Sequence, residues 1–298
     1  MITFDHVSYE VEGRTIIDDV SFCIEAGEFV SFVGTNGAGK STTMRLINGL
    51  LKPTSGCVRT AGRLTSETKS SEIARRVGFL FQNPDRQICC NTVHEELMFG
   101  FMAQKADPDV ARRRVDAIVE RFGFRPDAEP YLLNRGTRQL LALASVIVCE
   151  PEVVVLDEPT TGLDYRECEK VMEAVEELHE RGTTIVMVCH DMEVVSDHAR
   201  RVVAMTEGRV IGDGPAGDVL RDRDILRRAH LMPPQIMQIG MGLAARGVVG
   251  ETSAVARACT VDEMFDAIVA ARDETGEGGS LTWRVFSSTY PAIRRFIA

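Results

Sequence analysis

A glycine-rich loop spans Gly34-Thr35-Asn36-Gly37-Ala38-Gly39-Lys40-Ser41, and Thr42 follows it directly. The loop matches the pattern G-x-x-x-x-G-K-[ST], in which successive backbone N–H groups cradle phosphate oxygens. Its glycines allow the dihedral angles that such a cradle requires. Lys40 is predicted to place a positive charge between the β- and γ-phosphates, and Ser41 is predicted to offer its hydroxyl to Mg²⁺. We therefore expect residues 34–42 to bind the phosphates of a nucleotide.

The residues on either side of the loop support this interpretation. Glu28–Val33 is an apolar run of strand length, and Thr42–Leu50 has the character of a helix. The positive N-terminal end of that helix would face the same phosphates. The alternative is a glycine-rich turn that carries Lys-Ser by chance, but the order strand, loop, helix disfavours it.

Composition restricts the class of protein. The chain has 298 residues, 44% of them hydrophobic, which is enough for one large domain or two modest ones with a sizeable core. The formal net charge is 34 − 44 = −10. Because general nucleic-acid binding needs a basic surface, no nucleic-acid partner is expected.

The cysteines and the apolar runs bear on the compartment. The eight cysteines contain no C-x-x-C pair, and most lie in apolar runs, where cysteine usually packs as a small buried hydrophobe. This pattern favours a reducing compartment and argues against a zinc site. We expect neither a signal peptide nor a membrane span, since no apolar stretch reaches about 18 residues.

The order of apolar runs predicts an α/β domain over residues 1–215 with an extension over 216–298. The expected strands and hairpin are Ile2–Tyr9, Val20–Ile24, Glu28–Val33, Val77–Phe81, Val153–Leu156, Thr184–Cys189, Val202–Met205 and Arg209–Ile211. Residues 83–149 are predicted to be mainly helical. In the extension we expect a helix over Asp218–His230 and a flexible linker over Thr275–Ser280, and Leu281–Ala298 is amphipathic with no assignable role.

A second chemical signal follows the run Val153–Leu156, where Asp157 and Glu158 stand at the carboxyl end of a predicted buried strand. Asp157 is suited to hold Mg²⁺, and Glu158 is suited to accept a proton from an attacking water. Two acids that open a solvated turn would be the ordinary alternative, but a phosphate loop in the same chain makes it the weaker one.

Two further polar residues end apolar strands. Gln82 follows Val77–Phe81 and is predicted to reach the metal or the attacking water, and His190 follows Thr184–Cys189 and is predicted to contact the γ-phosphate and Glu158. The predicted catalytic residues are therefore Glu158, His190 and Gln82, and the predicted metal ligands are Ser41, Gln82 and Asp157.

Together with Thr161-Gly162-Leu163-Asp164, these motifs occur in the order found in the ATP-binding cassette (ABC) ATPases, which residues 1–215 resemble. The resemblance implies a P-loop NTPase core with a RecA-like, mostly parallel sheet, an N-terminal antiparallel β subdomain and a helical subdomain. It also implies that two cassettes face each other head to tail with ATP between them, and that Asp164 acts across that interface.

The family signature Leu-Ser-Gly-Gly-Gln is altered here to Leu133-Asn134-Arg135-Gly136-Thr137. The resemblance places Asn134 and Gly136 against the ATP of the partner cassette, where Arg135 brings a positive charge in place of a small residue. A heterodimer with unequal sites is therefore favoured over a homodimer. The family stacks adenine on an aromatic residue near the N-terminus, and the equivalent position here is Val11. Tyr9, two residues earlier on the same strand face, is predicted to take that role.

Two segments resemble the ATPases of energy-coupling-factor (ECF) transporters, which import vitamins and transition-metal ions. These segments are Phe81–Gln87 and Ala229–Gln235. The resemblance implies a transmembrane coupling subunit and a substrate-binding membrane subunit as partners, and a cytoplasmic chain that is peripheral on the inner face of the cell membrane. The acidic pair Glu95-Glu96 is a candidate contact for the coupling subunit. A soluble ABC ATPase without transport and the ATPase of an exporter stay open as alternatives.

Overall fold

The computed structural model describes residues 1–275, and its core contains a six-stranded sheet in the order β10-β9-β3-β8-β7-β6. All neighbouring strands in it are parallel except β9 and β10, which form the predicted hairpin. The strands are β3 (Phe29–Gly34), β6 (Val77–Leu80), β7 (Val153–Asp157), β8 (Thr184–Val188), β9 (Arg201–Thr206) and β10 (Arg209–Pro215). The predicted mostly parallel sheet is confirmed.

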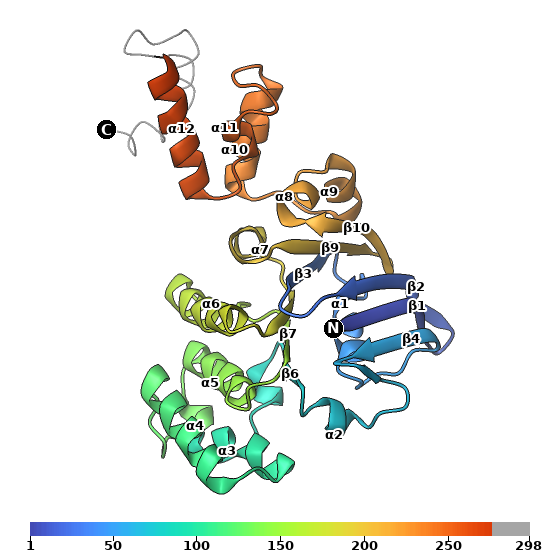
Figure 1. The fold of residues 1–298 in the computed structure, drawn as a ribbon, viewed down its shortest axis with the longest axis vertical. Helices are drawn as coiled ribbons and strands as arrows, with labels where there is room; N and C mark the ends of the chain where they lie inside the picture. The colour runs from blue at the N-terminus through green and yellow to red at the C-terminus, as the bar shows by residue number, and fades with distance from the viewer. Residues whose placement is uncertain (276–298) are drawn as a thin grey trace.

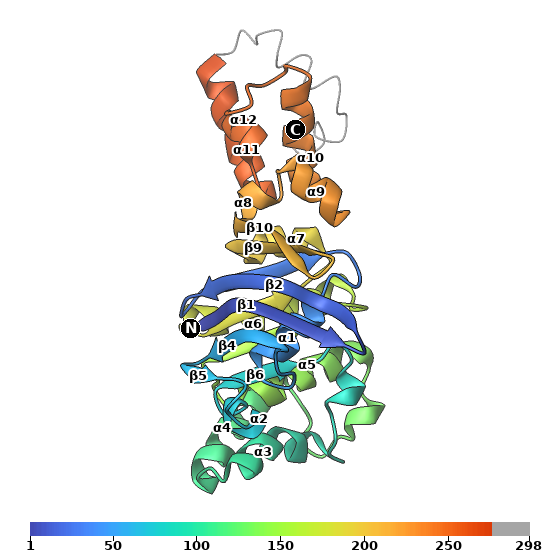
Figure 2. The same cartoon turned by 90° about the vertical axis from the view of Figure 1, so that its right-hand side faces the viewer.

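A smaller antiparallel sheet has the order β2-β1-β4-β5 and lies beside the larger one (Figure 2). Its strands are β1 (Ile2–Val11), β2 (Arg14–Ile24), β4 (Ser55–Thr60) and β5 (Arg63–Leu64). β2 begins earlier than the expected strand Val20–Ile24, because the turn at Glu12-Gly13 is tight enough for pairing to start at Arg14. This sheet is the predicted N-terminal β subdomain.

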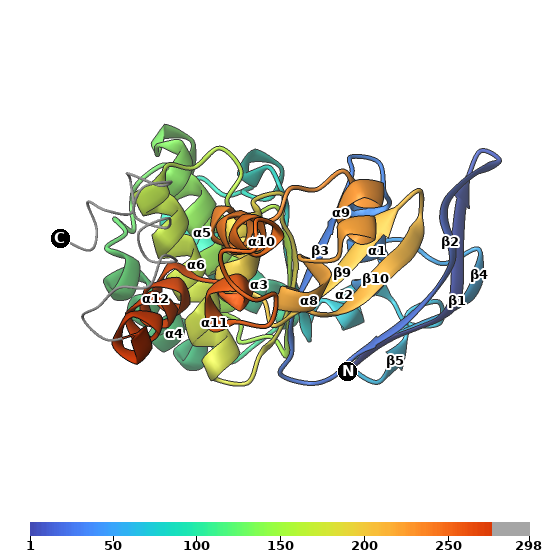
Figure 3. The ribbon, with the colours of Figure 1, turned by 90° about the horizontal axis from the view of Figure 1, so that it is seen from above.

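Side chains on the parallel strands point alternately to the two faces of the large sheet, and both faces are covered. In β7, Val154 and Leu156 belong to one hydrophobic cluster, whereas Val153 and Val155 belong to the other. Since successive side chains point to opposite faces, a continuous apolar run is needed when both faces are buried. Every residue of β7 is buried. Figures 1 and 3 show α5 and α6 on one side of this sheet and β1 and β2 on the other.

Residues 83–149 form the predicted helical region. Helices cover both faces of the large sheet, since Met44 and Ile73 belong to the cluster of Val153 and Val155, whereas the other helices contribute to the cluster of Val154 and Leu156. The helices are α1 (Lys40–Ile47), α2 (Ser70–Ile73), α3 (Val93–Gln104), α4 (Pro108–Phe122), α5 (Arg135–Ile147), α6 (Tyr165–Glu180) and α7 (Met192–His198), with short 3-10 helices η1 (Pro84–Arg86) and η2 (Pro130–Leu132). Thr92 opens α3 with a capping box to Glu95, and Asp107 caps α4. Figure 1 places α3 and α4 at the end of the molecule opposite α12.

The extension after β10 is helical. It contains α8 (Ala216–Val219), α9 (Arg223–Ala229), α10 (Gln235–Ala245), α11 (Ala254–Arg257) and α12 (Val261–Thr275). The single helix expected over Asp218–His230 is wrong, because Asp222 caps a new helix with bonds to the Asp224 and Ile225 amides. Leu243, Val255 and Met264 belong to a separate small core. The expected linker beyond Thr275 and the amphipathic tail lie outside the described residues.

The structure also bears on the burial of the cysteines and on membrane-spanning helices. The expectation that most cysteines are buried is wrong: only Cys189 is buried, Cys23 and Cys89 are exposed, and the other five are half-buried. All eight cysteines are free thiols. Within residues 1–275, no helix has both the length and the apolar character required to cross a membrane.

Candidate functional site

The glycine loop joins β3 to α1 as the pattern predicts, and two of its glycines have conformations that other residues rarely adopt. Gly34 has φ 138°, and a Cβ atom there would lie 1.9 Å from the Met205 carbonyl oxygen. Gly39 has φ 97° and forms the N-cap of α1. Because the cap is at Gly39, the helix begins at Lys40, before the expected Thr42, and it ends at Ile47 ahead of Gly49, which has φ 69°.

Lys40 is buried beneath this loop. Its ammonium group donates hydrogen bonds to the Gly34 and Thr35 carbonyl oxygens at 2.8 and 2.9 Å. Burial lowers the pKa of Lys40, while the nearby carboxylates of Glu158 and Asp157 oppose that shift. The charge of Lys40 is therefore held in a poorly solvated position beside two acids, where an incoming phosphate would be strongly attracted.

Ser41 and Asp157 meet although they are far apart in the sequence. The Ser41 hydroxyl donates to Asp157 Oδ1 at 3.1 Å. Asp157 is 6% exposed, and this burial raises the pKa of its carboxyl group, with Glu158 adding to the shift. A buried carboxylate next to a hydroxyl offers the oxygen ligands that Mg²⁺ prefers, and a cation would offset the cost of burying the charge. The pair therefore fits a Mg²⁺ site.

Glu158 is the meeting point of the polar residues at the strand ends. Its carboxylate lies 2.8 Å from His190 Nε2 and accepts a hydrogen bond from Gln82 Nε2 at 2.6 Å. The Thr161 hydroxyl donates to the same carboxylate at 3.0 Å. The backbone of Glu158 has φ 54°, and its N–H donates to the Val188 carbonyl oxygen, which turns the chain sharply after β7. The contact between Thr161 and Glu158 was not predicted from the sequence. The only indication in the sequence is that Thr161 lies three residues after Glu158.

Thr161 and His190 line an open cleft of about 980 Å³ at the carboxyl ends of the strands. The cleft is lined by Gly34–Asn36, Thr160–Leu163, His190–Glu193 and His230–Gln235. The last of these segments comes from the extension and is held by a hydrogen bond from the Gln235 N–H to Glu193 Oε1 at 2.7 Å. The sequence had linked this segment to the ECF ATPases but did not predict that it borders the cleft.

The altered signature lies at the start of α5, next to Thr161 and Gly162 of the cleft. Asn134 caps the helix, since its Oδ1 accepts the Thr137 N–H at 2.7 Å. Gly136 packs closely against α6: a Cβ atom there would lie 1.9 Å from the Glu167 carboxylate, so a larger residue would have to displace that side chain. Asp164 forms a capping box with the same Glu167 at the start of α6. The predicted contacts of Asn134, Gly136 and Asp164 across a dimer stay predictions.

Arg135 folds back onto its own chain. Its guanidinium donates to the Thr161 carbonyl oxygen at 3.0 Å and lies against Gly162. One turn later, Arg138 pairs with Asp85 at 2.6 Å, which joins α5 to the segment after Gln82. Both contacts connect the signature to loops that surround Glu158.

Two other expected contacts are placed differently. Tyr9 is half-buried against the hydrophobic cluster of the small sheet and is not among the described residues that line the cleft. Its stacking on adenine stays a prediction. Glu96 is 3% exposed, so it is not available as the expected contact for the coupling subunit: its Oε2 accepts the backbone N–H groups of Cys89 and Cys90. Glu95 is exposed.

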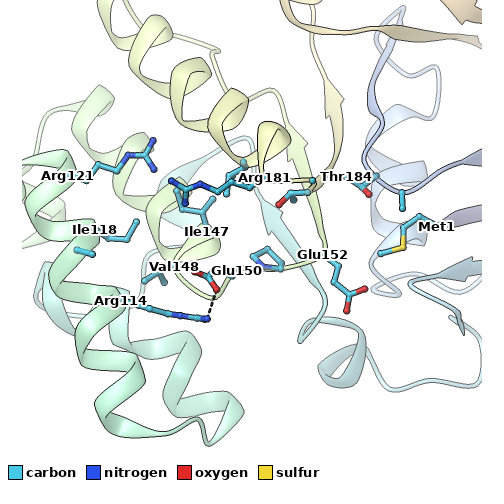
Figure 4. Close-up of a pocket in the computed structure, with 16 residues that line it drawn as sticks. Met1, Arg114, Ile118, Arg121, Ile147, Val148, Glu150, Glu152, Arg181 and Thr184 are labelled. Atoms are coloured by element: carbon cyan, nitrogen blue, oxygen red, sulfur yellow. Dashed lines mark ion pairs between the residues drawn. The ribbon is translucent and has the colours of Figure 1, made fainter.

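A second cavity, of about 770 Å³, lies at the amino ends of β7 and β8 and is lined by arginines (Figure 4). Arg114 is paired with Glu150, and Arg121 is paired with Glu177 at 2.7 Å. Arg181 lies 3.7 Å from the same Glu177. Because these cations already have acidic partners, we do not assign the cavity to the nucleotide.

The pKa of Asp157 leads to a prediction for the Asp157→Asn variant. Burial raises this pKa above its ordinary value of 3.8, so the ionised form costs stability at neutral pH, and the cost disappears below that ordinary value. Without nucleotide, the variant should be as stable as wild type at pH 7, or more stable by about 1 kcal/mol. It should lose the additional stabilisation that Mg²⁺ gives in the presence of ATP. Scanning calorimetry with and without Mg²⁺ measures both effects. Asp116→Asn, an exposed change, is the control, and a clear loss of stability at pH 7 without ligand would contradict the prediction.

Fold and site together define a P-loop nucleotide-binding cassette. Residues 17–161 match the family model described as ABC transporter. The chain is 36% identical over 227 residues to an energy-coupling factor transporter ATP-binding protein, EcfA2, from Acetivibrio thermocellus, which covers 75% of this chain and 81% of that protein. It therefore belongs to the ABC transporter ATP-binding proteins.

Two further comparisons agree with this membership. A putative ABC transporter ATP-binding protein from Caldanaerobacter subterraneus subsp. tengcongensis is 39% identical over 230 residues, which cover 76% of this chain. The match spans only 40% of that relative's length. The structure of cbiO1 from Clostridium perfringens, described as part of the ABC transporter complex cbiONQ, superposes with a TM-score of 0.68 and 32% identity over 79% of this chain and 96% of that one.

Proposed function

We propose that this chain binds and hydrolyses ATP as the energising subunit of an importer of the energy-coupling-factor type, whose substrates are vitamins or transition-metal ions. The observation that carries the ATPase assignment is the contact of Glu158 with Gln82, His190 and Thr161, directly after Asp157, which accepts a hydrogen bond from Ser41 of the phosphate loop. The transporter type rests on the relatives named above and on the segments Phe81–Gln87 and Ala229–Gln235.

Each side chain has a defined task in the hydrolysis of ATP. The loop amides and Lys40 hold the phosphates, and Ser41 and Asp157 would hold Mg²⁺, which supplies neutralising charge when bound. Glu158 accepts the proton of the attacking water, and His190 orients the carboxylate and contacts the γ-phosphate. Gln82 donates a hydrogen bond to Glu158 and so couples the site to the segment that follows Gln82. The ion pair between Asp85 and Arg138 joins that segment to α5.

Catalysis requires a second cassette, and we propose that the second cassette is a different chain. Arg135 occupies the signature position at which a small residue lets the backbone approach phosphate, and its side chain is committed to the Thr161 carbonyl oxygen. The site to which this chain lends its signature would therefore be the weaker one. The site built on its own Lys40 and Glu158, and completed by the partner's signature, would carry most of the turnover.

In this proposal the chain is peripheral on the inner face of the cell membrane. Closure of the two cassettes on ATP, and their release after hydrolysis, would move a transmembrane coupling subunit and a substrate-binding membrane subunit. The helical region around α3 would receive the coupling subunit, with the exposed Glu95 as a candidate contact.

Affinity purification of the tagged chain from gently solubilised membranes tests this assignment. We expect a second, different cassette together with transmembrane proteins in a fixed ratio. If no transmembrane protein co-purifies, the transport assignment fails and a soluble ABC ATPase is favoured. If the only other cassette is a second copy of this chain and both sites turn over, the unequal-site proposal fails while the ATPase assignment stands.

A further inference from the structure

Outside the nucleotide cleft, two cysteines and one carboxylate converge at the entrance to α3. Cys89 and Cys90 are neighbours in the loop that leads from η1 to α3, and their Sγ atoms are 4.0 Å apart. Glu96, in the first turns of α3, brings its carboxylate to the same point, so that one ligand atom from each residue lies within 4.8 Å of the others. In the sequence alone, the absence of a C-x-x-C pair argues against a zinc site. The structure shows that two adjacent cysteines bring their sulfur atoms close together here.

The carboxylate is fixed in place before any ligand arrives. Glu96 is 3% exposed, and its Oε2 accepts the N–H groups of Cys89 and Cys90 at 2.9 and 3.0 Å. A carboxylate has enough lone pairs to accept these bonds and still bind a cation. The loop beneath the cysteines is also anchored, since the Tyr131 hydroxyl donates to the Ile88 carbonyl oxygen at 2.7 Å. The ligand set is therefore preorganised on both sides.

We propose that Cys89, Cys90 and Glu96 form a binding site for one thiophilic divalent cation, which we assign as Zn²⁺. Thiolates select soft or borderline metals over Mg²⁺ and Ca²⁺, and Zn²⁺ accepts a mixed sulfur and oxygen set. With Zn–S bonds of about 2.3 Å in a tetrahedron, the two sulfurs would be about 3.8 Å apart, close to the 4.0 Å in the structure. A water would complete the fourth position.

A disulfide is the competing use of two adjacent cysteines, and the geometry disfavours it. The S–S bond requires about 2.05 Å, and bridged residues usually have Cα atoms more than about 4.4 Å apart, whereas neighbours across a trans peptide are about 3.8 Å apart. Cys89 is exposed and Cys90 is half-buried, so an ion can enter from solvent. A bound ion would tie the loop to α3 and stiffen the connection between Gln82 and the helical region.

Binding exchanges protons for the ion. Burial, with the negative charge of Glu96 next in effect, raises the pKa of the Cys90 thiol to about 12, so this thiol is protonated at neutral pH when no ion is bound. Cys90 must therefore lose this proton when it forms a bond to Zn²⁺. The affinity should therefore rise as the pH is increased.

The test uses the full chain, kept reduced, stripped of metal and free of nucleotide. Zn²⁺ is titrated in competition with a chromophoric chelator, and Co²⁺ is used separately to detect thiolate-to-metal charge-transfer absorption. We expect one ion per chain and a charge-transfer band. The double variant Cys89→Ser/Cys90→Ser should lose affinity at least about 100-fold and lose the band, because it removes ligand atoms and not merely their supports.

Two further variants keep the test decisive. Cys23→Ser removes an exposed cysteine on β2 and should bind as wild type does. Glu96→Gln should weaken binding while the Co²⁺ thiolate band persists, and the single change at the exposed Cys89 replaces the double variant if that one does not fold. Equal Zn²⁺ affinity in wild type and Cys89→Ser/Cys90→Ser would place the ion elsewhere, for example at Asp157, and would overturn the proposal. Absence of binding, or of the Co²⁺ band, would do the same.

Discussion

Replacement of Glu158 by Gln should lower ATP turnover by about 10²- to 10⁴-fold, the range that a general base contributes. Gln has the shape of Glu and can still accept a hydrogen bond from Gln82, but it cannot take the proton of the attacking water. ATP binding should change little, because the phosphate contacts come from the loop and Lys40. Phosphate release by the purified complex measures turnover, and calorimetry with ATP measures binding.

Glu152→Gln is the matched control for this experiment. Glu152 immediately precedes β7, at the end of the strand opposite Glu158. It pairs with Arg76 at 2.5 Å and is not among the residues that line the cleft. Its replacement should leave turnover unchanged. Near-normal hydrolysis in the Glu158→Gln variant would remove Glu158 from the role of base. If hydrolysis were lost only because ATP no longer bound, Glu158 would be a binding residue instead.

Lys40→Met should weaken ATP binding by about 100-fold, because a charge-assisted hydrogen bond contributes about 1.5–3 kcal/mol. Removal of the ammonium group also removes a positive charge that offsets the nearby carboxylates of Asp157 and Glu158. The same change should cost little stability. Burial lowers the pKa of Lys40, so folding disfavours its charge, and this offsets the loss of two hydrogen bonds to the loop carbonyl oxygens.

Calorimetric titration with Mg²⁺ and ATP and a thermal unfolding curve separate these two effects. Lys170→Met, an exposed change on α6, serves as the control for loss of one positive charge and should retain binding. If the ligand-free Lys40→Met variant unfolded at a much lower temperature than wild type, the charge of Lys40 would stabilise the fold. That result would contradict the prediction that its charge serves binding at a cost to stability. Unchanged affinity for ATP would contradict its contact with phosphate.

Short-range patterns were sufficient for much of the fold. The phosphate loop, the apolar runs that became β3, β7 and β8, and the polar residues that end them could all be found by inspection, because a strand buried on both faces must be continuously apolar. The helix expected over Asp218–His230 failed for a local reason: Asp222 offers a cap that favours two helices over one. The roles of Tyr9, Asn134 and Gly136 involve ligands or a second chain and stay predictions.

The sequence by itself determined that this protein has a phosphate-binding loop, a buried parallel sheet and acids at a strand end, since each of these features depends on residues that are adjacent in the chain. Only the tertiary structure decided which distant residues meet. Ser41 reaches Asp157, Arg135 reaches Thr161, and Glu96 turns inward to Cys89 and Cys90. The physical reason is that such contacts depend on how loops close over the edge of the sheet and on which carboxylates packing removes from water, and neither is set by the spacing of residues along the chain.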